Sequence, residues 1–169
     1  MPTLILPLVA GTALLLAGCG KSEAPATAPV AATPAAAPVD GVKAVVITAD
    51  DTMKFNVTEI RAHVGEKIRV TLKNIGRMPK QAMGHNWVLL VPMPDGGVLA
   101  LAQAAAARAP EYVPADAGRI IAHTKLLGPN ESDTVEFSAP DAPGEYPFIC
   151  TFPGHAALMK GKLIVAPKP

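Results

Sequence analysis

Apolar and polar residues alternate with a period of two along most of the chain beyond residue 40. In Lys67–Lys73, Ile68, Val70 and Leu72 are separated by polar residues, as expected for a strand with one buried face. Seven further segments are candidate strands, separated by Gly, Pro and Asn: Lys43–Ala49, Met53–Ile60, Asn86–Val91, Arg119–Thr124, Thr134–Ser138, Glu145–Cys150 and Lys162–Val165. Eight such strands predict an all-β, antiparallel sandwich.

One segment departs from this alternation. Val98–Ala109 is rich in Ala and Leu, and Pro110 follows it. Because Ala favours helices and Pro ends them, this segment predicts a single inserted helix that covers one side of the sandwich.

The first 18 residues predict a targeting segment rather than part of the fold. Leu4–Leu16 is apolar but too short for a spanning helix, and Leu16-Ala17-Gly18-Cys19 resembles the cleavage site of bacterial lipoproteins. By that resemblance residues 1–18 are a lipoprotein signal peptide and Cys19 is the lipidated first residue of the mature chain. The alternative is an ordinary signal peptide, with Cys19 free to form a disulfide.

Residues 19–40 are rich in Ala, Pro and Thr and have no hydrophobic periodicity. Such a composition cannot bury a core, and at about 3.1 Å per residue it could reach about 60 Å. We expect a lipidated Ala/Pro-rich linker that tethers a domain at residues 41–169; an inert tail is the alternative.

Composition narrows the range of functions. The length suits one domain of ordinary size, and the formal net charge is +1. So small a charge argues against nucleic acid and against a strongly steered acidic partner.

Three possible metal ligands lie close together in the turn Cys150–Met159, which contains a thiol, the imidazole of His155 and a thioether. Each residue alone has an ordinary explanation as core or loop. Together within ten residues they favour a metal site, and His85 is the candidate for a fourth ligand. Two His, one Cys and a weak axial Met are the ligands of a blue-copper electron-transfer centre.

Three motifs resemble azurin and the related auracyanins: Met83-Gly84-His85-Asn86-Trp87-Val88-Leu89, Ile121-Ala122-His123-Thr124-Lys125-Leu126, and Cys150-Thr151-Phe152-Pro153-Gly154-His155 with Met159-Lys160-Gly161. The resemblance covers Val45 to Val165, and its two ligand motifs are long and specific. It implies a cupredoxin-type Greek-key sandwich of about eight strands with one inserted helix.

The resemblance also implies the roles of individual residues around one copper ion that cycles between Cu(I) and Cu(II). His85, Cys150 and His155 would be the equatorial ligands, Met159 the distant axial ligand, and the Gly84 carbonyl a weak ligand opposite it. The backbone N–H groups directed at the thiolate would belong to two further residues, Asn86 and Phe152.

The remaining histidines limit the class of protein. The chain has four histidines, of which we expect His63 to be a solvated loop residue and His123 a surface residue without a ligand role. A copper enzyme with a second copper centre would need more histidines, so we expect no enzymatic activity. The prediction is a one-electron carrier; the alternative is a module that stores or delivers copper in the cell envelope.

The resemblance further implies an apolar docking surface through which the His155 ring edge emerges. The matching residues are Met53, Met78, Ala82, Met83, Phe152, Pro153, Gly154 and Ala157. We expect weak, transient complexes between a monomer and redox proteins such as c-type cytochromes or copper or haem reductases. We expect the protein on the periplasmic side of a bacterial membrane, with the outer membrane favoured because Gly20 rather than Asp follows Cys19.

Three further expectations concern single positions. The disulfide usual in this family is missing, and Glu66 stands where azurins carry its second cysteine. Asn74 replaces a buried, titrating His of azurins. Trp87 should point to the same side as His85, into the core.

Overall fold

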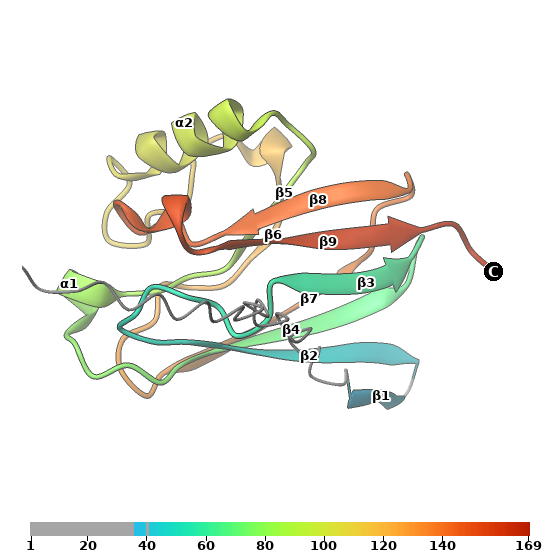
Figure 1. Ribbon diagram of the computed structural model, residues 1–169, viewed down its shortest axis with the longest axis horizontal. Coiled ribbons are helices and arrows are strands. Elements are labelled where there is room, and N and C mark those ends of the chain that lie inside the picture. Colours follow the sequence, from blue (N-terminus) through green and yellow to red (C-terminus); the bar gives the residue numbers. More distant parts are fainter. Residues whose placement is uncertain (1–35, 40) are drawn as a thin grey trace, which may run out of the picture. The chain divides into compact units, whose positions relative to one another are not determined.

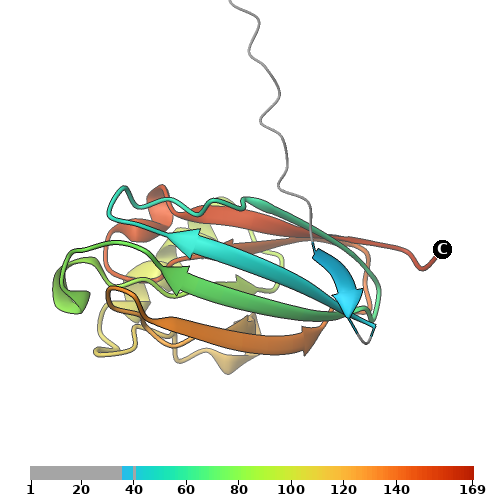
Figure 2. The same cartoon turned by 90° about the horizontal axis from the view of Figure 1, so that it is seen from below.

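Two β-sheets pack face to face in the computed structural model, which describes residues 36–39 and 41–169 (Figure 1). The first sheet has the order β1 (Ala36–Val39), β2 (Val42–Ala49), β4 (Lys67–Asn74) and β7 (Ser132–Ser138), which lie side by side in Figure 2. The second has the order β3 (Glu59–His63), β9 (Lys160–Ala166), β8 (Gly144–Ile149), β5 (Val88–Leu90) and β6 (Ile120–His123). The predicted all-β sandwich with an inserted helix is confirmed.

The prediction of a wholly antiparallel sandwich is wrong at two strand pairs. β2 runs parallel to β4, and β3 runs parallel to β9. In the first case β3, which lies in the other sheet, comes between β2 and β4 along the chain. The chain therefore re-enters the first sheet in its original direction.

The alternation seen in the sequence builds the main core between the sheets. Ile68, Val70 and Leu72 of β4 are fully buried there, together with Trp87. The prediction that Trp87 points into the core is therefore confirmed. Its ring packs against Phe148, with 5.5 Å between ring centroids.

A second apolar cluster lies between the β5–β8 part of the sheet and the inserted helix α2 (Asp95–Ala105), which covers that face in Figure 1. Val88 and Leu90 of β5 pack with Val98 and Leu101 of this helix. Since Leu89 faces the main core, β5 is buried on both sides, and this explains its continuous apolar sequence.

The helices are short. α2 begins three residues before the expected Val98, because Asp95 occupies the first turn, where a carboxylate favours the helix N-terminus. The helix ends at Ala105, before the expected Ala109. The other helical segments are α1 (Lys80–Met83), η1 (Ala117–Arg119) and η2 (His155–Ala157). Within residues 36–39 and 41–169, we find no helix of the length and hydrophobicity needed to cross a bilayer.

The strand predicted at Met53–Ile60 is wrong in its position. The strand β3 begins at Glu59, and the residues before it form a loop that is tied to β2 by hydrogen bonds between Thr48 and Asn56. Phe55 makes only an isolated bridge to Ala49. Alternation alone cannot identify a strand when no neighbouring strand is available to pair with it.

The predicted linker is corrected at its end, because Ala36–Val39 forms β1. It pairs with β2 through Ala36↔Ala44 and Val39↔Val42. β1 is an edge strand, the place in a sheet where a Pro such as Pro38 is tolerated. The predictions for the signal peptide at 1–18, lipidated Cys19 and the rest of the linker lie outside the described residues.

Glu66, at the position matched to a missing cysteine, joins neighbouring segments by polar contacts. Its carboxylate lies 3.4 Å from Nζ of Lys43 and accepts a hydrogen bond of 2.8 Å from the backbone N–H of His63. Both side chains of the ion pair are partly exposed, and such pairs contribute about 0–1 kcal/mol. This contact is non-covalent and therefore weaker than a disulfide.

Candidate metal centre

The loop between β8 and β9 places Cys150, His155 and Met159 around one point. Cys150 directly follows β8, and its N–H donates to the Met159 carbonyl at 2.9 Å, while the Met159 N–H donates to the His155 carbonyl at 2.8 Å. Gly154 has φ of 85°, a conformation that other residues rarely adopt. The turn predicted at Pro153-Gly154 therefore brings the imidazole back towards the sulfur.

His85 comes from a different part of the chain, between α1 and β5. Its backbone pairs with Leu127 in both directions, at 3.1 and 2.8 Å. Asn74, which is buried at the end of β4, donates from its side chain to the Leu127 carbonyl at 3.1 Å. Two other segments of the chain, around Leu127 and Asn74, thus fix the position of this histidine.

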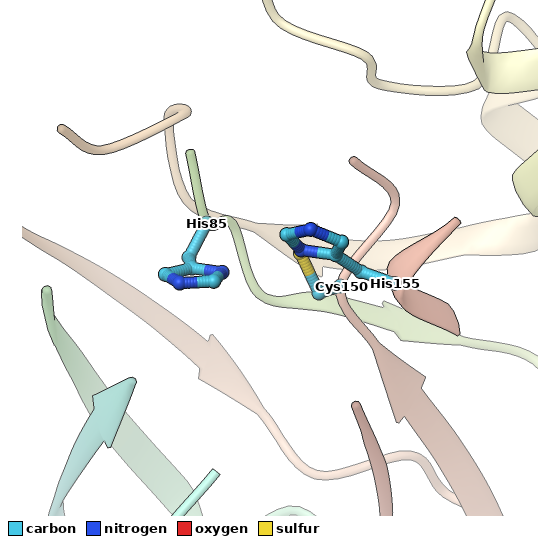
Figure 3. Close-up of side chains that lie close together, drawn as sticks. All are labelled: His85, Cys150 and His155. Carbon is cyan, nitrogen blue, oxygen red and sulfur yellow. The ribbon is translucent and has the colours of Figure 1, made fainter. Parts of the chain in front are cut away.

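The three residues form a closed cluster in the interior (Figure 3). One ligand atom from each of His85, Cys150 and His155 lies within 4.8 Å of the others. Cys150 Sγ is 3.6 Å from Nδ1 of His155, and the two imidazole rings have centroids 5.1 Å apart. His155 is 3 % exposed and the other two are fully buried, so water is largely excluded.

The electrostatics of the cluster suit a metal ion. Among the described residues, neither ring nitrogen of His85 has a hydrogen-bond partner, although both are buried, and an unpartnered buried nitrogen is costly without a ligand. Burial lowers the pKa of His85, and the neighbouring Asp50 carbonyl, which lies outside hydrogen-bonding geometry, partly offsets this. Burial and the adjacent His85 lower the pKa of His155 to about 4. Both imidazoles are therefore neutral and able to coordinate.

The thiol is held in an apolar site with two polar contacts. Burial raises the pKa of Cys150 to about 12, and the backbone N–H groups of Asn86 and Phe152 act in the opposite direction. A bound cation would replace the proton on this sulfur. The N–H groups would then stabilise the resulting thiolate.

Side-chain hydrogen bonds connect the two segments that supply the ligands. The Asn86 carbonyl oxygen accepts from the Thr151 N–H at 2.8 Å, and the Asn86 amide donates to the Thr151 hydroxyl at 2.9 Å. Both residues are fully buried. Because each follows a ligand in sequence, this pair fixes His85 and Cys150 relative to one another.

Met159 and Gly84 are both buried beside this cluster. Met159 belongs to the same core cluster as Cys150. A Cβ on Gly84 would lie 2.6 Å from the Lys80 carbonyl, so only glycine fits there. The site therefore has a thioether from the ligand loop. Next to His85, the backbone of Gly84 lies close to the Lys80 carbonyl.

The residues predicted as a docking surface differ in exposure. Met53 and Met83 are partly exposed, and five others are exposed: Met78, Ala82, Pro153, Gly154 and Ala157. Phe152 is only 8 % exposed; it is a packing residue and adds little surface. Leu158, which sequence reasoning missed, is 63 % exposed; an apolar residue beside exposed Ala157 in the ligand loop was the available clue.

The other two histidines lie on the surface, away from the cluster. His63 contacts Glu66 at 3.7 Å, and Nδ1 of His123 lies 3.1 Å from the Thr124 carbonyl. Sequence reasoning also missed Tyr112, whose ring packs against Phe152 with 5.2 Å between centroids. Its place in a loop after α2 gave no sign of this contact.

Comparison with known proteins identifies related sequences. A family model described as copper binding proteins, plastocyanin/azurin family, matches residues 42–166. Azurin of Achromobacter denitrificans is 44% identical over 120 residues, covering 69% of this chain and 80% of that protein. Outer membrane protein H.8 of Neisseria meningitidis serogroup B is 40% identical over 122 residues, covering 71% of this chain and 66% of that protein.

Solved structures agree with these relatives. Auracyanin A, a blue copper protein from Chloroflexus aurantiacus, superposes with a TM-score of 0.68 at 34% identity and covers 75% of this chain and 100% of its own. An azurin from Methylomonas sp. strain J gives a TM-score of 0.63 at 29% identity, covering 73% of this chain and 97% of its own.

The residues present fit copper. Thiolate and thioether ligands suit Cu(I), and imidazoles suit both oxidation states. The two unpartnered nitrogens of His85 and the closely placed Cys150 and His155 provide the donors, with Met159 beside them. These four residues form a type 1 copper site.

Proposed function

This chain belongs to the plastocyanin/azurin family of copper-binding proteins, and we propose that it carries single electrons between redox partners on the periplasmic side of a bacterial membrane. The observation that carries this proposal is the buried cluster of His85, Cys150 and His155, in which both ring nitrogens of His85 lack a hydrogen-bond partner among the described residues. The chain is a blue copper electron-transfer protein; its location and its partners are the new parts of the proposal.

The protein contributes rigidity and the exclusion of water. Bound copper would supply a one-electron couple between Cu(I) and Cu(II). The loop hydrogen bonds of Met159 and the Asn86–Thr151 pair hold the donor atoms in one arrangement. The backbone N–H groups of Asn86 and Phe152 act on the sulfur, and the Gly84 carbonyl would be a further weak ligand. A site that needs little rearrangement transfers electrons quickly.

Electrons would enter and leave through the apolar surface around His155. This surface, here called the docking patch, contains Met53, Met78, Ala82, Met83, Pro153, Gly154, Ala157 and Leu158. None of its side chains is charged. A small apolar patch supports weak, short-lived complexes, as expected for a monomer that exchanges electrons with c-type cytochromes or copper or haem reductases.

We also propose that Cys19 carries a lipid anchor, with the outer membrane favoured over the inner. The support is the stretch Leu16-Ala17-Gly18-Cys19 and the similarity to a relative named outer membrane protein H.8. Expressing the full chain with Cys19→Ala should move the protein from the membrane fraction to the soluble periplasmic fraction. Retention of the variant in the membrane would contradict a lipid on this residue.

Visible spectroscopy with copper titration tests the electron-carrier function. The full chain should bind one copper with an intense blue band from thiolate-to-Cu(II) charge transfer, and a c-type cytochrome should bleach the band reversibly by one electron. Binding without a blue colour, or a blue site that no redox protein can reduce, would contradict the proposal.

The same preparation distinguishes an electron carrier from a copper store. A store must release its metal, whereas burial of His85, Cys150 and Met159 favours slow release. We expect copper loss to an added chelator to be much slower than electron exchange with a redox partner. Rapid, complete transfer of copper to the chelator would instead favour storage or delivery.

A further inference from the structure

The segment that follows α2 contacts both ligand-bearing segments. The carbonyl of Glu111 accepts a hydrogen bond of 3.1 Å from the Asn86 amide, and the carbonyl of Tyr112 accepts one of 2.6 Å from the Thr151 hydroxyl. Asn86 and Thr151 are the residues next to His85 and Cys150. Two consecutive carbonyls therefore hold the pair that joins the two ligand segments.

The segment itself is anchored at both of these residues. The Tyr112 N–H donates to the Arg108 carbonyl at 2.9 Å, just beyond the end of α2. The Glu111 carboxylate accepts from the Leu126 N–H at 2.9 Å, and Leu126 precedes the residue that pairs with His85. Tyr112 also has φ of 52°, which is uncommon for a residue with a side chain. Its backbone is thus fixed by contacts from several sides.

The Tyr112 ring extends this contact towards the metal site. It packs edge-on against Phe152, at 5.2 Å between centroids and an interplanar angle of 76°. Phe152 in turn packs on the His155 ring, with 4.6 Å between centroids. The rings of Tyr112, Phe152 and His155 form a continuous row from a partly exposed position to a ligand.

Phe152 has two roles in the ligand loop, and this gives the row its importance. Its ring lies against His155 and its backbone N–H is directed at the Cys150 sulfur. A shift of this residue would therefore alter both the position of the imidazole and the backbone N–H that faces the sulfur. Tyr112 is an aromatic residue from outside the loop that packs on Phe152.

We propose that Tyr112 is a positioning residue of the copper site: its ring holds Phe152 in place, and through Phe152 it fixes the His155 ring and the N–H contact to Cys150. The inference rests on the type 1 site described above. Within the described residues the Tyr112 hydroxyl makes no hydrogen bond, so the aromatic ring alone carries this effect.

The test compares Tyr112→Leu and Tyr112→Phe with the matched control Phe137→Leu. Phe137 is also partly buried and packs on an aromatic residue, Trp87, with 5.9 Å between centroids. Tyr112→Leu should shift the charge-transfer band and lower the reduction potential. Weaker N–H bonding to sulfur and greater water access both favour the oxidised, more positive site. Tyr112→Phe and Phe137→Leu should match the unmodified protein in both measurements.

A second measurement needs no copper. In the copper-free full chain, the reaction of the Cys150 thiol with a disulfide reagent reports how often the loop opens. The same reaction with Cys150→Ser added to each variant measures the contribution of the other cysteine, Cys19, which is then subtracted. The thiol should react about tenfold faster in Tyr112→Leu, because loss of packing lowers the free energy of local opening, and at an unchanged rate in Tyr112→Phe and Phe137→Leu.

Several results would overturn the proposal. They are an unchanged potential, band and labelling rate in Tyr112→Leu, an equal shift in Tyr112→Phe, or an equal shift in the Phe137→Leu control. If circular dichroism shows that Tyr112→Leu is unfolded, Tyr112→Met provides the non-aromatic variant. A chain that never gives a blue band would remove the proposed function, whereas the thiol labelling would still test the contact between Tyr112 and the loop.

Discussion

The two segments that supply the copper ligands are built in different ways. The β8–β9 loop contains three ligands within ten residues, and its backbone hydrogen bonds between Cys150, His155 and Met159 are internal to it. His85 is the only side-chain ligand of its segment and depends on Leu127 and Asn74, which lie in other segments of the chain. The loop forms most of the site locally, whereas the complete site requires the folded sandwich.

This difference explains what each segment can tolerate. A change in the loop acts directly on donor atoms and should change the colour of the protein or its reduction potential. A change beside His85 acts on the surface or on distant supports, and should change rates or stability before it changes the colour. Four predictions test this division, in order of decreasing effect.

The largest effect is expected from Cys150→Ser. The serine hydroxyl cannot give the thiolate charge-transfer band, so the blue absorption should be lost completely. The sandwich should remain folded by circular dichroism, since the core is formed by the strands. Met93→Leu, which lies outside the loop, should stay blue. A blue Cys150→Ser protein would show that the ligand assignment is wrong.

A charge placed beside His85 should slow electron transfer without changing the site. Met83→Lys puts a cation on the docking patch, and self-exchange and transfer to a redox partner should each slow by about tenfold, because a charge on the docking surface disfavours the encounter. The spectrum and potential should hardly change. Val46→Lys is the control: Val46 is 51 % exposed on β2, and its substitution should leave both rates unchanged. Normal rates in Met83→Lys would remove the patch from the mechanism.

Met159→Leu tests the weakest ligand of the loop. Leucine has a similar volume without a donor, so the colour should remain, the potential should rise, and the stability should change by less than about 1.5 kcal/mol. Voltammetry and thermal unfolding of the copper protein measure these quantities. Loss of copper would identify Met159 as a strong ligand instead.

The smallest effect concerns pH. Asn74 occupies the buried position that is matched to a titrating histidine of azurins. Its side-chain amide neither gains nor loses a proton near neutral pH. In the copper-free protein, burial and the adjacent His85 lower the pKa of His155 to about 4, and bound copper would compete further with a proton for this imidazole. The reduction potential should therefore be flat between pH 6 and 8. A clear fall of the potential with rising pH would contradict this prediction.

The sequence allowed the ligand loop to be predicted well because its geometry is local. The spacing of Cys150, His155 and Met159 between two strands, with Gly154 at the turn, already requires the three side chains to converge. The sandwich and its helix also followed from hydrophobic periodicity and a run of alanines, apart from β1.

What could not be predicted depends on pairing and packing between distant segments. The polar-apolar alternation at Met53–Ile60 had no partner strand, and β1 formed from a Pro-containing segment because β2 offered a free edge. Phe152 was expected on the surface, but Tyr112 covers it. The contacts of Tyr112 depend on where the chain returns after α2, which no local pattern specifies.

The absence of the family's disulfide has a consequence for how this protein matures. Between residues 41 and 169 Cys150 is the only cysteine, and Glu66 makes an ion pair with Lys43. The domain can therefore reach its native state without a thiol oxidase or a disulfide isomerase. Its ligand sulfur has no second thiol within the domain with which it could form an incorrect disulfide. Synthesis in a reducing compartment should give the same fold as synthesis in an oxidising one.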